Sequence, residues 1–557
     1  MAENTEWKDK TRGEHIEVFE EAAVLAAGDT VLVDKEGHVR KLPVPSSSLN
    51  DPLNFSYWKK AGVILSCCWF AFMSLAVVGS LGPIILVFIN LYAPEGYSTN
   101  TIMLIATLPS FFTGVGNYLI LPFALAYGRR PAFLLAAVAL VASCIGAAAS
   151  RDFIGHLVAR IFQGLTSGAT ESLLPLMMAE VTYVHQRGKV FGLYWSLQSI
   201  ISNSLTLASS YEVAALSWRW YYGIMTIAGG VGLVLAILFA FETRFHRPPT
   251  FADGQVIITD DFGNTRLMTD DEYREYSAAY GTSSSPSSSS SSPSDTQPKT
   301  YAQLLHPWPG RAPNAARVVA TSFVEMAKCC TAPGIIYATL VPSVTTGCMI
   351  AMSLSYSAVL TEHYGQSAAS VGLINIASIP ASFAALFVAG YVGDRLAVAM
   401  ARRYNGGVHQ PEHRLLPFAF GGVVGAAGLL VYAFYADGRP GGGESGDGGW
   451  VVVYVAWGLY LFAFVLSLIS STTFAAEVWP KAPGPALVVV VGTKNIISFA
   501  ISYALTPMLE RYGYRTSYGI LSAIHMAFFL AGIPVYYLNP KWRRWRAERD
   551  ALKVTLG

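Results

Sequence analysis

The chain consists largely of apolar stretches of about 20 residues that follow one another with short gaps, and a stretch of that length spans a bilayer as a helix. Only 13% of its 557 residues are charged, whereas soluble globular proteins carry about 25%. Because lipid offers backbone groups no hydrogen-bond partner, each stretch should be helical. The sequence therefore predicts an all-α polytopic membrane protein.

The apolar stretches fall into two groups of six, which gives twelve predicted transmembrane helices. Their ranges are 61–89, 101–125, 132–150, 153–179, 189–212 and 219–241, then 333–360, 370–392, 415–436, 451–473, 485–507 and 515–538. The predicted domains are a cytoplasmic N-terminal tail (1–60), an N-terminal six-helix half (61–241), a cytoplasmic central loop (242–332), a C-terminal six-helix half (333–538) and a cytoplasmic C-terminal tail (539–557).

A basic turn recurs at the end of the second stretch of each group. It reads Ala126-Tyr127-Gly128-Arg129-Arg130-Pro131 in the first group and Gly390-Tyr391-Val392-Gly393-Asp394-Arg395 in the second, with Arg402 and Arg403 following. The offset between the turns is close to the offset between the first stretches. The two groups are therefore predicted to be parallel pseudo-repeats, one of the architectures of secondary transporters.

Basic residues in the short loops predict the orientation, since cytoplasmic loops carry the excess of Lys and Arg. With the N-terminus inside, the cytoplasmic loops hold Arg129, Arg130, Arg187, Lys189, Arg395, Arg402, Arg403, Arg414 and Lys481, and the opposite loops hold Arg151, Arg219, Arg439, Arg511 and Arg515. Both termini are thus expected in the cytoplasm. The plasma membrane is the expected location, with the vacuolar membrane as the alternative.

The central loop contains the low-complexity run 283–292, which predicts disorder. Before it, residues 255–264 have the pattern of a short strand and turn, and residues 31–39 of the N-terminal tail are similar.

Other function classes are not supported. No basic domain or aromatic–basic motif indicates nucleic-acid binding, and the six cysteines form neither a CxxC pair nor a Cys/His cluster with metal spacing. No nucleophile triad or phosphate-binding loop occurs. We therefore expect a monomer that is not an enzyme, with no cofactor, in contact with the bilayer and a small-molecule substrate.

Several ordered strings resemble the major facilitator superfamily, and more specifically its fungal twelve-spanner drug:proton antiporter-like branch, close to polyamine and cation carriers. These strings are Asp51–Phe55, Gly128–Pro131, Arg160–Gly164, Val184–Gly188, Trp218–Trp220, Glu242–Arg244, Ala401–Gly407 and Gln410–Leu415. The resemblance implies alternating access and proton-coupled efflux of a small organic compound, such as a secondary metabolite or xenobiotic. The alternatives are an uptake carrier for a cation, polyamine or nutrient, and a non-transporting receptor or scaffold on the same fold.

Two charges in the fourth predicted helix are the candidates for proton coupling. The resemblance places Arg160 in an Arg-x-x-Gln-Gly motif associated with coupling, although the charge could instead hold a helix end. Glu171 lies eleven residues later on the same helix face, about 16 Å along the axis, so the two side chains cannot pair. Glu171 is expected to be a proton or cation site or a structural carboxyl.

Polar residues of other spans are candidates for the substrate cavity. They are Gln198, Asn203, Tyr356, Asn375, Lys494, Asn495 and Tyr503. Lys494 is expected to meet an anionic substrate group or, with more weight, Glu477 at the end of the tenth span. Polar stripes such as Gln198 and Asn203 more often join helices.

The basic turns are the candidates for gating, by resemblance. The residues are Arg129, Arg130, Asp394, Arg395, Arg402 and Arg403. Leu125 stands where the first turn would carry its acid, so this turn is expected to lack an acidic partner of its own and the second to carry more of a latch. Glu180 is expected to be a gate or a residue that reaches the interface.

Overall fold

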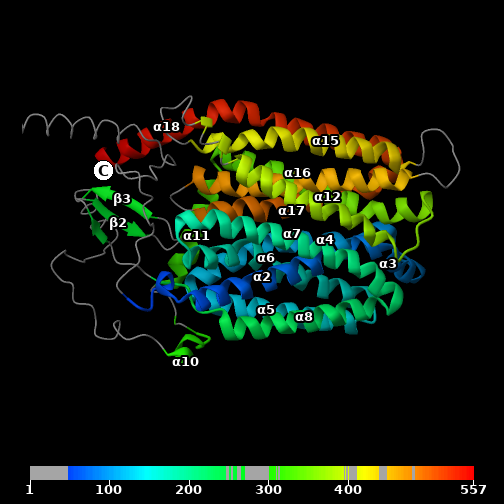
Figure 1. Ribbon diagram of the computed structural model, residues 1–557, viewed down its shortest axis with the longest axis horizontal. Coiled ribbons are helices and arrows are strands. Elements are labelled where there is room, and N and C mark those ends of the chain that lie inside the picture. Colours follow the sequence, from blue (N-terminus) through cyan, green and yellow to red (C-terminus); the bar gives the residue numbers. More distant parts are fainter. Residues whose placement is uncertain are drawn as a thin grey trace, which may run out of the picture.

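The structure is a computed structural model that describes residues 48–245, 250–252, 255–259, 265–269, 300–308, 310, 314–393, 395–396, 399–400, 410–437, 448–479 and 483–556. Long helices run side by side along its longest axis (Figure 1). We call the end of this bundle that carries helix α10 the α10 end, and the end that carries helix α3 the α3 end.

The first half contains six long helices. Its elements are α2 (Tyr57–Gly79), η2 (Gly82–Ile84), α3 (Ile85–Tyr92), α4 (Thr99–Tyr127), α5 (Arg129–Ala149), α6 (Phe153–Glu180), α7 (Val184–Ala215) and α8 (Trp218–Phe239). Local chemistry sets several boundaries. Ser98 accepts a hydrogen bond from Thr101 N at the start of α4, and Asp152 accepts one from Gly155 N at the start of α6. The first predicted span, 61–89, is divided between α2 and α3, with η2 between them.

The second half repeats this arrangement. Its elements are α12 (Pro333–Ala358), η4 (Val359–His363), η5 (Val371–Ala377), α13 (Ser378–Leu386), η6 (Phe387–Val392), η7 (Pro411–Leu415), α15 (Leu416–Ala436), α16 (Gly449–Val478), α17 (Pro483–Leu530) and α18 (Gly532–Leu556). α17 comprises two helices, because Gly513 has a φ of 71° that breaks the helical path.

Nine segments of the described residues are long and apolar enough to cross a membrane, by length and composition. The last of them, Gly484–Arg546, contains the two helices that meet at Gly513. α6 and α7 have 28 and 32 residues and are more polar, but they are long enough to span. Together these helices correspond to the twelve predicted spans, and the predicted all-helical, two-half architecture of the membrane-spanning part is confirmed.

Outside the spans, the described part of the central loop has structure of its own. Strands β1 (Thr250–Ala252), β2 (Gln255–Thr259) and β3 (Thr265–Thr269) form an antiparallel sheet in the order β1-β2-β3. β2 confirms the strand predicted at 255–264, whereas residues 31–39 and 283–292 lie outside the described residues. Helices α10 (Tyr301–Leu304) and α11 (Ala315–Cys329) were not predicted.

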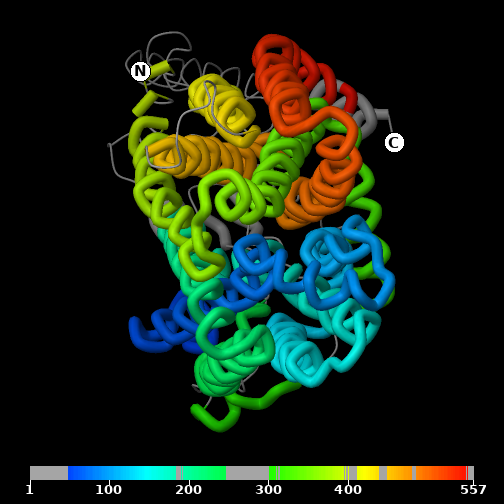
Figure 2. Tube along the Cα trace, turned by 90° about the vertical axis from the view of Figure 1, so that its right-hand side faces the viewer, coloured from blue at the N-terminus to red at the C-terminus, as the bar shows by residue number. Residues whose placement is uncertain are grey.

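The two halves lie against each other with the first half (blue to green) below the second (lime to red) in the end-on view of Figure 2. Helix α4 packs along α17, and α7 packs against α13 and η5. α11 contacts both α4 and α17, so it lies across the seam at the α10 end. The seam between the halves is the surface on which a site open to both halves must form.

Candidate functional site

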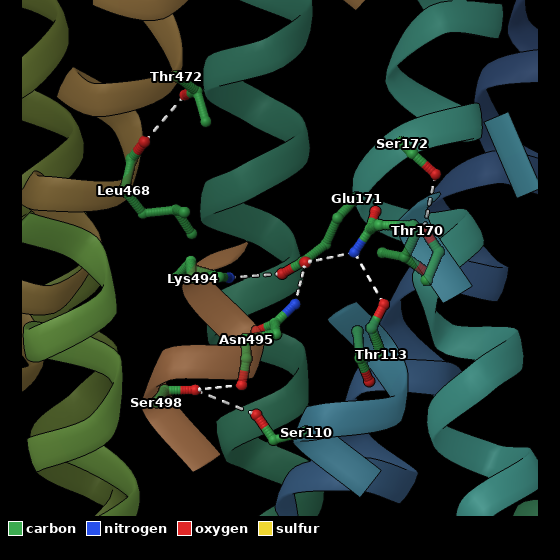
Figure 3. Close-up of polar contacts among 12 residues, drawn as sticks. Ser110, Thr113, Thr170, Glu171, Ser172, Leu468, Thr472, Lys494, Asn495 and Ser498 are labelled. Atoms are coloured by element: carbon green, nitrogen blue, oxygen red, sulfur yellow. Dashed lines mark hydrogen bonds and ion pairs between the residues drawn. The ribbon is translucent and has the colours of Figure 1, made fainter. Parts of the chain in front are cut away.

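Glu171 is the centre of a buried polar network that joins the halves (Figure 3). Its Oε1 accepts a hydrogen bond from Lys494 Nζ of α17 at 2.7 Å, and its Oε2 accepts one from Asn495 Nδ2 at 2.5 Å. Oε2 also accepts from Asn117 Nδ2 of α4 at 3.2 Å. The carboxylate therefore has three donors from two other helices, one helix in each half.

The Glu171–Lys494 ion pair is almost completely withdrawn from solvent. The side chains are 5% and 3% exposed. Desolvating both charges is costly, and removing one partner of such a pair typically costs about 3–5 kcal/mol. The pair thus makes the contact between α6 and α17 sensitive to the charge of either residue. The predicted pairing of Lys494 with Glu477 is wrong, because α6 rather than α16 supplies its acid.

Small residues bring the backbones close enough to form this network. A Cβ on Gly168 of α6 would lie 2.5 Å from Asn117 N, so the glycine lets α4 place Asn117 beside Glu171. Across the seam, a Cβ on Gly114 would lie 2.5 Å from the carbonyl oxygen of Gly492. Close approach of small residues is a usual way for membrane helices to associate.

Further hydrogen bonds follow the α4–α17 seam on both sides of Glu171. Tyr118 and Thr493 hydroxyls are 2.6 Å apart, and Ser110 and Ser498 hydroxyls are 3.3 Å apart. Toward the α3 end, Asn100 Nδ2 donates to the Tyr503 hydroxyl at 3.1 Å. Tyr503, predicted to face the cavity, is 38% exposed and belongs to this outer part of the seam.

Arg160 lies elsewhere, toward the α3 end of α6, and is fully buried. Its guanidinium donates to the carbonyls of Val77 (2.6 Å) and Val78 (2.9 Å) and to Gln163 Oε1 (2.8 Å). Those two carbonyls belong to the last turn of α2, where helical carbonyls lack intrahelical donors.

Arg160 Nε also donates to the Ile105 carbonyl of α4, at 2.9 Å. This carbonyl is free because Pro109, four residues on, has no N–H. Arg160 therefore joins α2, α4 and α6 within the first half, and its predicted coupling role stays a prediction.

The other predicted cavity residues form two groups. Gln198 Nε2 donates to Ser202 Oγ at 3.4 Å and Asn203 Nδ2 to the Ser199 carbonyl at 2.7 Å, so both bond within α7. In the second half, Asn375 Nδ2 donates to the Tyr356 hydroxyl at 3.4 Å and to the Gly372 carbonyl at 3.1 Å. These residues flank seam contacts, since the Ser199 and Ser382 hydroxyls are 2.9 Å apart across it.

The first basic turn has acidic partners. Gly128 has a φ of 114° and joins α4 to α5, which points Arg129 at the end of α6. Arg129 Nη2 lies 2.7 Å from Glu180 Oε1, and both side chains are buried. Arg129 N and Arg130 N donate to Glu242. The turn has no acid of its own, and its acidic partners are Glu180 at the end of α6 and Glu242 beyond the end of α8.

Arg130 closes the same corner through carbonyls. Its Nη2 donates to Ile237 at 2.7 Å and to Leu305 at 3.1 Å, and its Nη1 donates to Ala240. It thus holds the end of α8 and the end of α10 together.

The second turn is described only in part. Arg395 stacks over the Tyr391 ring, with its Cζ 4.2 Å from the ring centroid. Asp394, Arg402 and Arg403 lie outside the described residues. The equivalent of the Arg129–Glu180 pair is Arg414–Glu477, at 2.5 Å, and its side chains are 24% and 26% exposed.

A bundle of two repeated six-helix halves, with a buried charge pair on the seam, defines a polytopic membrane protein of the secondary-transporter class. The model of the Major Facilitator Superfamily matches residues 64–484. The chain belongs to this superfamily of transporters, which are not enzymes.

Similar fungal proteins cover nearly the whole chain. An uncharacterised MFS-type transporter of Schizosaccharomyces pombe is 21% identical over 94% of this chain and 91% of its own length. Protein HOL1 of Saccharomyces cerevisiae is 23% identical over 90% of each chain, and efflux pump radE of Floropilus chiversii is 21% identical over 77% of this chain and 71% of its own.

A solved structure shows the same fold. The crystal structure of a D-xylose-proton symporter covers 86% of this chain and 97% of its own, at 16% identity and a TM-score of 0.53. The drug:proton antiporter-like branch predicted from the sequence is not established by these likenesses.

Sequence reasoning missed Asn117, and it named Glu180, Glu242 and Glu477 without the arginines that they contact. Asn117 is the one Asn of the mainly apolar span 101–125, and a polar amide in such a span could have indicated a buried polar contact. The acids gave no local signal for pairing, because their basic partners are 51 to 113 residues distant. Among the described residues, no group of three or more His, Cys, Asp and Glu side chains could hold a metal ion.

Proposed function

We propose that the chain is a proton-coupled secondary transporter of a small organic compound, working by alternating access, with Glu171 as the proton site. One observation carries this proposal: the single carboxylate of α6 that pairs across the seam is buried and bonded to a lysine of the other half.

The physical reason lies in the motion that alternating access requires. When one half rocks against the other, contacts across the seam change, including that between α6 and α17. A proton on Glu171 removes the negative charge that attracts Lys494. It therefore changes the free-energy difference between the two arrangements of the halves by a fraction of the about 3–5 kcal/mol that the loss of one partner of a buried pair costs. Two states differing by a few kcal/mol then change population several-fold.

The direction of transport has two candidates. The family resemblance favours export, in which proton and substrate occupy the site in turn. Uptake, in which they occupy it together, is the alternative. A receptor or scaffold is the alternative from another class, and it predicts no flux of any compound.

Transport is tested in two steps. Compounds retained by cells with and without the protein are compared without preselection, and those that differ are loaded into vesicles holding the purified chain. We expect flux that follows an imposed pH gradient and is lost in Glu171→Gln. Lys328→Gln, at an exposed Lys of α11, is the matched control. Flux indifferent to the gradient would remove proton coupling, and no flux would favour the receptor.

Orientation is part of the proposal. We place the α10 end, the basic turns and both termini in the cytoplasm, with the turns acting as gates. The plasma membrane is the proposed location. A tag inserted at Ser290 should resist an impermeant reagent on intact cells, and labelling from outside would reverse the orientation.

A further inference from the structure

We propose that the substrate carries an acidic group, which binds Lys494 while Glu171 holds one proton, so that acid and proton cross together. This inference rests on the proposed function and deepens it by naming the substrate class. Of the two directions of transport considered above, it favours uptake, in which proton and substrate occupy the site together, over export, in which they occupy it in turn.

The first argument is that the two members of the ion pair are not equally supported. When Lys494 leaves, Glu171 Oε2 keeps the amide donors of Asn495 and Asn117. Asn117 Nδ2 also donates to the Thr113 carbonyl at 3.0 Å, which orients the amide while Glu171 is ionised. Lys494 Nζ, by contrast, has its hydrogen bond to Glu171 as its support. The group that a ligand must replace is therefore the acceptor of Lys494.

The second argument is that the amide beside Glu171 has an unused acceptor. Asn117 Oδ1 is buried and has no hydrogen-bond partner among the described residues. A neutral carboxyl gains an O–H donor that a carboxylate lacks. Protonation of Glu171 thus adds a donor, and rotation of the Asn117 amide about its Cβ–Cγ bond would turn the unsatisfied Oδ1 toward it in place of Nδ2.

The third argument is charge balance in a dry site. Lys494 is the cation in contact with Glu171, and the neighbouring Tyr194 hydroxyl of α7 is neutral and donates to the Thr170 carbonyl at 2.8 Å. The Arg160 guanidinium does not contact Glu171, because it donates its hydrogen bonds to the carbonyls of Val77, Val78 and Ile105. The described groups that face Glu171 therefore sum to no net charge while the pair is intact.

Different ligands disturb this balance differently. A cationic ligand on Glu171 would leave two positive charges side by side, one without an anion, which is strongly unfavourable in a buried site. A neutral ligand replaces neither partner. An acid with one proton leaves a neutral Glu171, and the new carboxylate pairs with Lys494.

The step balances without a redox partner. One proton from water on the entry side forms the O–H bond on Glu171, and the Lys494 ammonium exchanges one carboxylate for another. On the exit side the acid leaves, the proton returns to water, and Lys494 pairs with Glu171 again. An inward proton gradient would therefore drive uptake of the acid.

The test compares ligands that differ in charge but share a ring. Benzoate, benzamide and benzylamine, with the corresponding naphthalene series, are titrated against the full purified chain in mildly acidic and mildly alkaline buffer. The shift in unfolding midpoint gives an apparent Kd. We expect the acids alone to bind, with an apparent Kd that weakens about tenfold for each pH unit at which Glu171 is ionised.

Two variants sharpen the test. Glu171→Gln keeps the shape of a neutral carboxyl, so it should bind the acids equally well in both buffers. Lys494→Gln should lose acid binding, and Lys328→Gln should match the wild type. Since midpoints are compared with and without ligand, a lower starting stability does not mask the result.

The inference is overturned if the amide or amine binds as well as the acid, if acid binding survives in Lys494→Gln, or if no acid binds the wild type. Proton-driven flux in vesicles alongside any of these results would leave the proposed function standing and reject the acidic substrate alone. An absence of all flux rejects the proposed function itself.

Discussion

Helices α6 and α16 occupy equivalent places in the two halves, yet their buried chemistry differs. Each ends in a glutamate paired to an arginine, Glu180 in α6 and Glu477 in α16. Arg160 lies 20 residues before Glu180, where α16 has Trp457 before Glu477. Glu171 lies nine residues before the same glutamate, where α16 has Leu468. The repeat preserves the end of the helix and not its middle.

This difference shows how one fold separates structural and functional charges. In α16 the equivalent of Arg160 is Trp457, which donates to Ser378 Oγ at 3.0 Å and packs against Tyr356. The second half is thus joined there by an aromatic residue without a buried charge. Its cation for the seam, Lys494, comes from α17 instead. Each half therefore contributes one member of the Glu171–Lys494 pair on the seam.

The largest effect is expected from Arg160→Gln. The buried carbonyls of Val77 and Ile105 and the partly buried carbonyl of Val78 lose charged donors, and each unsatisfied buried group costs about 1–3 kcal/mol. Trp457→Phe, the matched change in α16, removes one neutral hydrogen bond worth about 0.5–1.5 kcal/mol. Unfolding midpoints in detergent measure both. A wild-type midpoint with lost proton-driven flux in Arg160→Gln would assign Arg160 to coupling instead.

The ion pairs at the ends of α6 and α16 should differ next. Glu180→Gln removes the carboxylate from a buried pair and should destabilise the fold by about 3–5 kcal/mol. Glu477→Gln acts on a pair that is about a quarter exposed, at 24% and 26%, and should cost less than about 1 kcal/mol.

A double variant checks the cause of this difference. Arg129→Gln combined with Glu180→Gln should be less destabilised than the sum of the single variants, because no buried charge is left without its partner. Equal losses in the two halves would show that burial does not govern these pairs.

The smallest difference between paired variants is expected for two glycines, one on the seam and one away from it. Gly114→Ala places a Cβ 2.5 Å from the Gly492 carbonyl and 2.7 Å from Ile496, so α4 and α17 must separate slightly, at about 1–3 kcal/mol. Gly230→Ala, in α8, has no heavy atom within 4 Å and should be neutral or slightly stabilising. Crosslinking of cysteines placed on α4 and α17 should fall in the first variant alone. Unchanged crosslinking would mean that side chains beside Gly114 rearrange to make room for the Cβ while α4 and α17 stay in contact.

The sequence by itself determined the membrane class, the two-half repeat and the individual candidates Glu171, Lys494 and Arg129. It could do so because span length and helix periodicity are local properties, set by lipid and by backbone hydrogen bonding. It also showed that Arg160 and Glu171 are too far apart to pair, since that depends on one helix alone.

Only the tertiary structure decided which charges meet. Lys494 contacts Glu171, 323 residues away, rather than Glu477, and Arg129 contacts Glu180 rather than an acid of its own turn. Such pairings depend on which helix faces pack against one another. The periodic pattern of a sequence shows which residues share a face of one helix, but not which other helix packs against that face. The close approach of α4 to α6 and α17 settled it here, because glycines let the backbones meet where the charges lie.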